Sequence, residues 1–366
     1  MNSEREDGNM QTKSDQLAEL ADHLKLHRSF TVVDGHSDLV ADILRRRQRG
    51  EKAVLLHCYA QELRNAGIRV LMMSTGGDAP VQNIGSDDPM WCTLKRVLAI
   101  QQEADESAAA VALCRSVADV EAAIEADKIA LLMMIEGGRP LRDDLDAVKF
   151  YYLIGIRSIQ LTWNARNLLG DGCAESATGG KLTRFGKAVV QEMNSLGMLI
   201  DLSHSSESTF YSVAETSTSP FIVSHANARA LCNHVRNLTD DQIKLLAQKG
   251  GLMGTCFFPR FIDPERPSLE RLLDHVDHIA GLVGTDYIAI GADLIYYALD
   301  IFEAELTGGR GAGIYGGSTF DIPDDLKDLR SFPLFSRGLL HRGYSHDDVD
   351  KIMGRNLLRV YKQVIG

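Results

Sequence analysis

Eight short apolar runs, each followed by a turn and a helix-like stretch, most constrain the fold of this chain. They are rich in Val, Ile, Leu and Met, and they occupy residues 31–38, 68–77, 129–138, 156–164, 197–205, 220–227, 250–258 and 287–294. Segments with helical apolar spacing lie between them, at residues 87–107, 116–127, 182–197, 239–250 and 268–284. Continuous apolar strands separated by helices indicate a parallel sheet that is buried on both faces. Eight such units predict an α/β fold, a closed (β/α)8 TIM barrel.

An open, doubly wound sheet is the alternative architecture. Such sheets often carry a glycine-rich phosphate fingerprint after the first strand, and that fingerprint is absent here. The chain has 366 residues, which is above the usual size of one domain but within reach of one α/β barrel. We therefore expect a barrel domain at residues 29–366, preceded by a polar segment and a short helix at residues 1–28.

Charge and composition exclude several classes of partner. The formal net charge is -11, from 50 acidic and 39 basic residues, and no block of Lys and Arg occurs. This balance argues against nucleic acid or an anionic membrane as a partner. The amino terminus is polar and acidic, unlike a signal peptide, and no apolar run approaches the roughly 20 residues that span a bilayer. Six cysteines without CxxC pairs suggest reduced thiols, so we expect a cytoplasmic protein.

Metal-binding residue types stand at the ends of five of the eight runs. The chemistry of such a barrel lies at the carboxyl ends of its strands. His36 and Asp38 are two residues apart on an extended chain, so their side chains point to the same side. Glu136 ends an apolar run, and burying its carboxylate would cost several kcal/mol unless a cation or hydrogen-bond donors compensate. One such histidine alone is more often a structural residue, but a coincidence over so many strand ends is a poor explanation. The residues are His36, Asp38, Glu136, His204, His225 and Asp293.

Imidazole and carboxylate together suit zinc, with iron, manganese or cobalt as alternatives. The five side chains other than Asp293 exceed what one tetrahedral site needs, which favours two ions that share a bridging carboxylate. Glu136 lies between the other ligands in chain order and is the natural bridge. The eight remaining histidines lie on helical or loop patterns. Among them, "DHVDH" at residues 274–278 fits a solvated helix face better than a metal site.

The sequence resembles the renal or membrane dipeptidase family of zinc peptidases, within the amidohydrolase-type metal barrels. The matching motifs are "DGHSD", "MMIEGG", "IDLSHSS", "VSHANARAL", "RNLTDDQI" and "IGADL", in the family's order over nearly the entire barrel. The resemblance implies a binuclear zinc centre. One ion would be held by His36, Asp38 and Glu136, and the other by Glu136, His204 and His225.

The resemblance also implies roles in substrate binding. In the family, the arginine of "RN" binds the carboxylate of a dipeptide, which corresponds to Arg236. The aspartate of the last strand meets the free amine and handles protons, which corresponds to Asp293. The plainer alternatives are that Arg236 pairs with Asp240 or Asp241, and that Asp293 only holds a loop.

The chain departs from the family at two positions. The family's "LTH" motif supplies a histidine for the tetrahedral intermediate, and here Trp163 takes that place with Asn164 beside it. Tryptophan has one N–H donor and no cationic form, so Asn164 would have to donate instead. Ile295 stands where many relatives have a second acidic residue. Both departures bear on activity and substrate choice.

The sequence thus predicts a zinc-dependent, membrane-dipeptidase-like hydrolase that cleaves dipeptides, including those with a D-residue at the C-terminal position, by a metal-bridging hydroxide. Two alternatives stay open. One is another binuclear-metal amide or lactone hydrolase, because fold does not fix substrate. The other is a metal-retaining, inactive binding protein. A homodimer agrees with the family, which commonly pairs.

Overall fold

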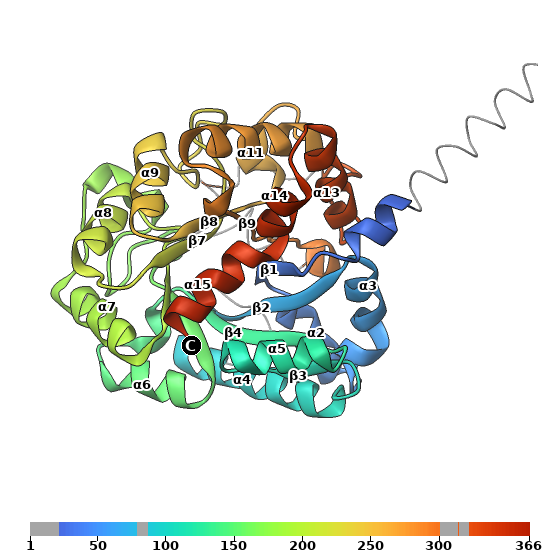
Figure 1. Cartoon of the computed structure of the whole chain (residues 1–366). Coiled ribbons are helices and arrows are strands. Elements are labelled where there is room, and N and C mark those ends of the chain that lie inside the picture. The colour runs from blue at the N-terminus through green and yellow to red at the C-terminus, as the bar shows by residue number, and fades with distance from the viewer. Residues whose placement is uncertain (1–21, 79–86, 301–313, 315–321) are drawn as a thin grey trace, which may run out of the picture.

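The eight predicted strands form one nearly closed barrel of parallel strands (Figure 1). The computed structural model describes residues 22–78, 87–300, 314 and 322–366. Neighbouring strands follow the order β1-β2-β4-β5-β6-β7-β8-β9, and every pairing is parallel. The predicted (β/α)8 TIM barrel is therefore confirmed. The strands are β1 (Val32–Ser37), β2 (Ile68–Gly77), β4 (Ile129–Glu136), β5 (Ile156–Gln160), β6 (Leu199–Asp201), β7 (Phe221–Ala226), β8 (Leu252–Thr255) and β9 (Ile288–Ile290).

Helices surround the barrel, and the five predicted helical segments correspond to α4, α5, α7, α9 and α11. Polar caps set several of their starts, since Ser116 with Asp119 and Thr239 with Gln242 form reciprocal capping boxes before α5 and α9. The helices are α2 (Val40–Gln48), α3 (Ala60–Asn65), α4 (Pro89–Glu106), α5 (Val117–Glu125), α6 (Asp146–Leu153), α7 (Arg184–Leu196), α8 (Glu207–Thr216), α9 (Asp240–Gln248), α10 (Pro259–Ile262), α11 (Leu269–Val283), α13 (Ser331–His341), α14 (His346–Asp350) and α15 (Asn356–Val364). Short π- or 3-10-helical turns are η1 (Leu55–Tyr59), η2 (Arg139–Leu141), η3 (Cys173–Thr178), η4 (Thr285–Tyr287), η5 (Tyr296–Ala298) and η6 (Lys351–Arg355).

A ninth strand, β3 (Val111–Leu113), was not predicted and pairs with the start of β4 outside the barrel order. Of the predicted segment 1–28, residues 1–21 lie outside the described part of the chain, and residues 22–27 are helical. In the described part of the chain, no helix combines the length and apolar character needed to cross a bilayer. The six cysteines are all free thiols.

A buried carboxylate links the first and last strands of the barrel, which do not form a paired ladder among the described residues. Asp34 Oδ1 accepts hydrogen bonds from the backbone N–H groups of Ala292, at 2.9 Å, and His36, at 3.3 Å. The N–H of Asp293 also approaches the carbonyl oxygen of His36, at 3.4 Å. Burial raises the pKa of Asp34 to about 7. The seam of the barrel therefore lies beside His36 and Asp293.

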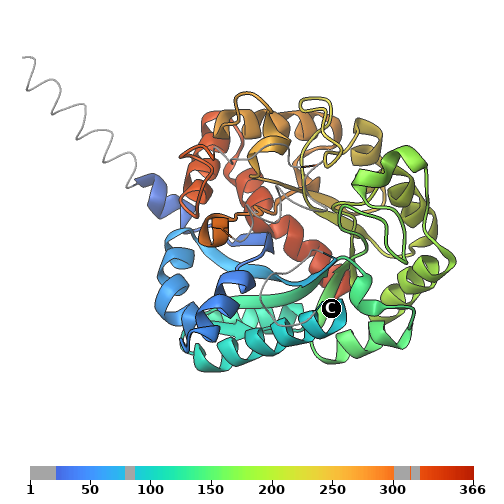
Figure 2. The same cartoon turned by 180° about the vertical axis from the view of Figure 1, so that it is seen from behind.

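Helix α15 closes the end of the barrel at which the strands begin. In Figure 1 it crosses in front of the strands, and Figure 2 shows the opposite side of the molecule. Leu357, Val360 and Tyr361 pack into one apolar cluster with inward-facing strand residues such as Val33 and Leu132. With that end filled by side chains, the functional site is left to the carboxyl ends of the strands.

Candidate metal centre

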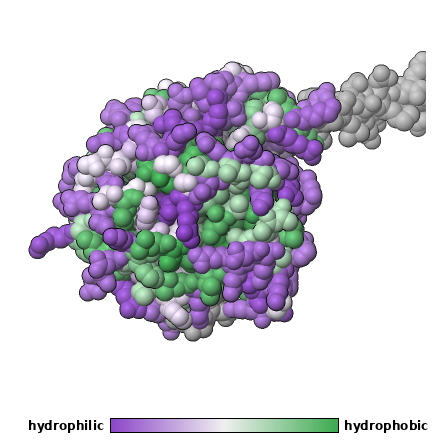
Figure 3. All heavy atoms as spheres, turned by 60° about the horizontal axis from the view of Figure 1, so that its bottom comes forward, coloured by the Kyte–Doolittle hydropathy of each residue, from purple (hydrophilic) through white to green (hydrophobic). Residues whose placement is uncertain are grey.

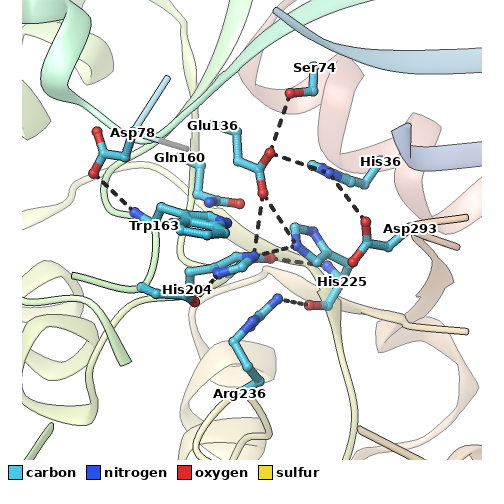
Figure 4. A network of polar contacts seen from close by, with 12 residues as sticks. His36, Ser74, Asp78, Glu136, Gln160, Trp163, His204, His225, Arg236 and Asp293 are labelled. Atoms are coloured by element: carbon cyan, nitrogen blue, oxygen red, sulfur yellow. Dashed lines mark hydrogen bonds and ion pairs between the residues drawn. The ribbon is translucent and has the colours of Figure 1, made fainter. Parts of the chain in front are cut away.

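The six strand-end residues predicted to form the site converge at the carboxyl end of the barrel, and Figure 4 labels all of them except Asp38. Three carboxylates surround Nε2 of His36, which lies 3.6 Å from Asp38 Oδ2, 3.8 Å from Glu136 Oε2 and 3.8 Å from Asp293 Oδ1. The other oxygen of Glu136, Oε1, lies 3.4 Å from His204 Nε2 and 4.0 Å from His225 Nε2. Glu136 is therefore placed between the two sets of candidate ligands, as the bridging position requires.

The carboxylates of the site are crowded and almost without solvent. Burial raises the pKa of Glu136 to about 8, and the nearby charge of Asp38 acts in the same direction. Burial likewise raises the pKa of Asp293 to about 6. For His36, burial acts to lower the pKa, but the negative charges of Glu136 and its neighbours outweigh it and raise the pKa to about 10. The cluster thus carries excess negative charge that a cation would stabilise.

Two of the histidines present neutral rings with nitrogens close together. Burial lowers the pKa of His204 and of His225 well below the ordinary value. Their Nε2 atoms lie only 3.0 Å apart. Two imidazole nitrogens that bind one zinc ion at about 2.0–2.1 Å have a similar separation. The donor set of the second candidate ion is therefore prearranged by these two rings and Glu136.

His36 provides an independent test of whether the residues fit a metal. Its ring is fully buried, yet neither of its nitrogens has a hydrogen-bond partner among the described residues. Buried polar atoms are rarely left unsatisfied, so Nε2 of His36 needs a ligand that the polypeptide does not supply. His36 with Glu136 and His225, and His36 with Asp38 and Asp293, place their ligand atoms within 4.8 Å of one another. The side chains fit a pair of divalent ions.

Two site residues adopt a backbone conformation that is uncommon for residues other than glycine. His204 has φ 64° and Asp293 has φ 53°. Such left-handed residues cost free energy and cluster at functional sites. Both residues lie three positions after the end of a strand, β6 for His204 and β9 for Asp293, so this local turn aims their side chains at the centre.

Arg236 lies at the edge of the site and follows β7. The residue is 2% exposed, and its guanidinium donates from Nη2 to the carbonyl oxygen of His225 at 3.1 Å and lies, at Cζ, 5.2 Å from the ring centre of Phe261. Its Nε has no hydrogen-bond partner, and no carboxylate of the described residues forms an ion pair with it. The alternative pairing with Asp240 is not observed, since Asp240 pairs with His278 instead. Arg236 thus retains an N–H donor for an anionic group.

Trp163 and Asn164 both lie beside His204, but in different ways. The Trp163 ring stacks on the imidazole, with centroids 5.8 Å apart and an interplanar angle of 29°. Asn164 Oδ1 accepts a hydrogen bond from His204 Nδ1 at 2.7 Å. Asn164 thus orients a candidate metal ligand, whereas the predicted role was donation to a substrate. Asp78 anchors this loop, because its Oδ2 accepts from the Trp163 N–H at 3.2 Å and from Asn167 Nδ2 at 2.8 Å.

Sequence reasoning did not identify several polar residues around the site. Asp34, Asp78 and Asp201 are each buried and accept hydrogen bonds from backbone or side-chain donors beside the candidate ligands. The only sequence signal was a carboxylate inside or just after an apolar run. The prediction of a solvated "DHVDH" face was wrong for His275, which is 1% exposed and joins Ala228 N–H to the Ile262 carbonyl oxygen.

Comparison with known proteins shows which family the chain resembles. A family model described as "Membrane dipeptidase (Peptidase family M19)" matches residues 20–365. Human Dipeptidase 3 is 30% identical over 355 residues, which cover 93% of this chain and 66% of that protein, so the chain spans just under two thirds of that relative.

Solved structures resemble the chain over nearly its whole length. An amidohydrolase from Pseudomonas aeruginosa matches with a TM-score of 0.78 and 25% identity, covering 93% of this chain and 98% of that one. A metallo peptidase from Rhodobacter sphaeroides, liganded with a phosphinate mimic of the dipeptide L-Ala-D-Ala, matches with a TM-score of 0.78 and 22% identity, covering 92% and 99%.

Proposed function

Because the chain belongs to the membrane dipeptidase family, peptidase family M19, we propose that it is a zinc-dependent enzyme that hydrolyses the peptide bond of dipeptides. The single observation that carries the proposal is the position of Glu136. Its two oxygens reach His36 on one side and His204 on the other, at 3.8 and 3.4 Å. A carboxylate that faces two sets of ligands suits a pair of ions.

Five residues are proposed to hold the ions: Asp38, and four that Figure 4 labels, Glu136 and the three histidines around it. His36, Asp38 and Glu136 would bind one ion, and Glu136, His204 and His225 the other. When bound, such a pair would activate water as the nucleophile at neutral pH and polarise the scissile carbonyl. Imidazole with carboxylate favours zinc, and manganese, iron or cobalt would also bind this donor set.

Arg236 is proposed to bind the terminal carboxylate of the substrate. Its guanidinium is buried and its Nε keeps an unused donor, which suits a planar anion. A fixed distance between this group and Glu136 would restrict the substrate to two residues. The Rhodobacter structure holds a mimic of L-Ala-D-Ala, and on this basis we propose that a D-residue is accepted at the C-terminal position.

Asp293 is proposed to move the proton. Its Oδ1 faces His36 Nε2, and burial together with the negative charge of Asp38 keeps its pKa above the usual range. A carboxyl group with a raised pKa can accept a proton during attack and deliver it to the leaving nitrogen. The same carboxylate is proposed to meet the free amine of the substrate, as the family resemblance implies.

Trp163, which stands in place of the family's histidine, favours two alternative functions that rank below the main proposal. Without the family's histidine, one donor to the tetrahedral intermediate is lost, which can reduce turnover about a hundredfold or more. The site would then serve another amide or lactone substrate, or bind a dipeptide without cleaving it. The inactive form is the weaker of the two alternatives, because the whole ligand set, Arg236 and Asp293 are all present.

One experiment separates these functions. Metal-free protein is loaded with zinc and offered L,L and L,D dipeptides, N-acyl amino acids and lactones, with the Glu136→Gln variant as control. Cleavage of dipeptides that requires both metal and Glu136 supports the proposal. Cleavage only of lactones or acyl amino acids supports the second function. Dipeptide binding by calorimetry without cleavage identifies a binding protein.

Location and assembly are also proposals. Six free cysteines and the acidic net charge suit a cytoplasmic protein that acts on small molecules, not on nucleic acid or membranes, and cell fractionation tests this. A homodimer would cover the exposed apolar side chains of α4 and α6, Trp91, Leu98, Phe150 and Leu153. Figure 3 brings this side forward and shows hydrophobic residues gathered among hydrophilic ones. Analytical ultracentrifugation of the wild type and of Phe150→Glu tests the dimer.

A further inference from the structure

We propose that Asp201, acting through the hydroxyl of Ser224, is a positioning residue that keeps the ring proton of His225 on Nδ1 and so presents Nε2 to a metal ion. The inference rests on the metal-ligand role of His225 proposed above. None of the sequence motifs assigned a role to Asp201 or Ser224, although both lie inside apolar strand runs, in β6 and β7.

The three groups form a short chain of hydrogen bonds inside the barrel. His225 Nδ1 lies 2.8 Å from Ser224 Oγ, and Ser224 Oγ lies 2.5 Å from Asp201 Oδ2. All three residues are at most 2% exposed. The Ser224 hydroxyl donates its single proton to Asp201 Oδ2. The lone pairs of Oγ then receive Nδ1–H, and Nε2 of His225 is left unprotonated.

The carboxylate of Asp201 is held in one orientation. Its other oxygen, Oδ1, accepts from the backbone N–H of Ser203, the hydroxyl of Ser203 and the backbone N–H of Ser224, each at 3.0 Å. The neighbouring strands also pack tightly against Ser224. A Cβ at Gly254 or Gly291 would lie 1.8 or 1.9 Å from the Ser224 carbonyl oxygen. Oδ2 therefore faces Ser224, because rotating the carboxylate would break the hydrogen bonds that hold Oδ1.

The two histidines of the second candidate ion are oriented by different chemistry. The Nδ1–H of His204 meets the neutral amide oxygen of Asn164 directly. The chain from His225 instead ends on a buried carboxylate, which raises the basicity of the ring. Asp201 thus gives His225 the stronger donor nitrogen of the pair.

The Asp201→Asn variant tests the proposal with almost no change of shape. The three donors on Oδ1 would keep the amide oxygen in place, so the amide NH2 would face and donate to Ser224 Oγ. The Ser224 hydroxyl would then be free to turn toward His225 Nδ1, at 2.8 Å, and the ring proton would move to Nε2. A comparable Asp→Asn change in the Ser-His-Asp triad of serine proteases leaves the geometry intact but gives the wrong histidine tautomer.

Two readouts do not depend on enzyme activity. In metal-free protein, 15N NMR of the histidine rings reports the tautomer of His225, and we expect Nδ1–H in the wild type and Nε2–H in Asp201→Asn. Titration with Co²⁺, followed by its visible absorption, reports metal affinity. We expect binding about 10- to 100-fold weaker at one of the two sites in the variant.

Ser203→Ala is the matched control. The Ser203 hydroxyl belongs to the same network, lies 3.1 Å from Ser224 Oγ and accepts from the His225 backbone N–H, but it does not face Nδ1. A purely structural network predicts that Ser203→Ala weakens Co²⁺ binding at least as much as Asp201→Asn. The proposal predicts a clearly smaller loss and an unchanged tautomer in Ser203→Ala.

A second pair of variants covers the case in which Asp201→Asn does not fold. Ser224→Ala should weaken Co²⁺ binding, and Ser224→Thr, which keeps the hydroxyl, should restore it. Unchanged tautomer and affinity in Asp201→Asn, or in Ser224→Ala, would overturn the proposal. If the wild type binds no Co²⁺, the metal assignment fails instead, while the NMR tautomer still decides whether Asp201 controls the ring.

Discussion

The ring of Trp163 stacks on the imidazole of His204, with centroids 5.8 Å apart. Trp163 occupies the place at which the family carries a histidine, so an apolar ring covers a candidate metal ligand where a polar donor would be expected. Its backbone N–H is fixed by Asp78, and its side chain packs with Phe258, Phe261 and Ile295. The Trp163 ring is therefore packed at the carboxyl end of the barrel, beside the candidate metal centre.

Trp163→His should increase the turnover of dipeptides by about tenfold to a hundredfold, because a second donor to the tetrahedral oxygen is restored. Steady-state kinetics with one L,L and one L,D dipeptide measure kcat and KM. Trp163→Phe serves as the control, since it keeps an apolar ring but adds no donor. If Trp163→His is no faster than Trp163→Phe, the missing histidine does not limit this enzyme.

Arg236→Met should lower kcat/KM for dipeptides by a factor that corresponds to about 2–5 kcal/mol, since one partner of a buried charged contact is removed. The wild type should also discriminate against dipeptides with an amidated C-terminus, and Arg236→Met should lose that discrimination. Paired kinetics on free and amidated substrates provide the measurement. Equal discrimination by both proteins would place the substrate carboxylate elsewhere.

Glu136→Gln should reduce bound zinc from two ions to at most one for each chain and lower activity at least about a hundredfold, because a neutral amide is a poor bridge between cations. Elemental analysis after gel filtration gives the stoichiometry. Added zinc should also raise the Tm of metal-free wild type much more than that of the variant, since only native ligands bind it. Two tightly held ions in Glu136→Gln would rule out the bridge.

His27 should make the protein less stable as the pH falls. Its ring is fully buried between Ala66 and Ser336, and burial lowers its pKa to about 4. The unfolded chain, with a pKa near 6.5, binds the proton more readily, so stability is complete above about pH 6.5 and is lost as the pH falls toward 4. The loss by pH 4 amounts to about 3 kcal/mol, because the folded protein binds this proton only near a pKa of about 4.

Urea unfolding at a series of pH values measures this effect. His27→Gln cannot titrate, so its free energy of unfolding should change less between pH 6.5 and pH 4 than that of the wild type. Parallel pH profiles for the two proteins would show that the buried ring of His27 is not the titrating group.

The sequence predicted most of the barrel because each strand carries a strong local signal. Continuous apolar runs and helices with polar caps mark their own positions, and the metal-capable residues stand at the run ends where a barrel places its chemistry. Strand β3 gives a weaker signal, since it is only three residues long and the apolar run around it, residues 108–114, is mostly alanine. His275 was misread because the partners that bury it lie 47 and 13 residues away.

What the sequence determined by itself is the eight barrel strands and the candidate ligands at their ends, since spacing and apolar character act over a few residues. The tertiary structure decided how these ligands are supported: Asp34 at the barrel seam, Asn164 behind His204, and Asp201 behind His225. Each of these contacts joins different strands or loops, so its length depends on register and on barrel closure. Those properties arise only when the whole sheet is assembled, and no single segment encodes them.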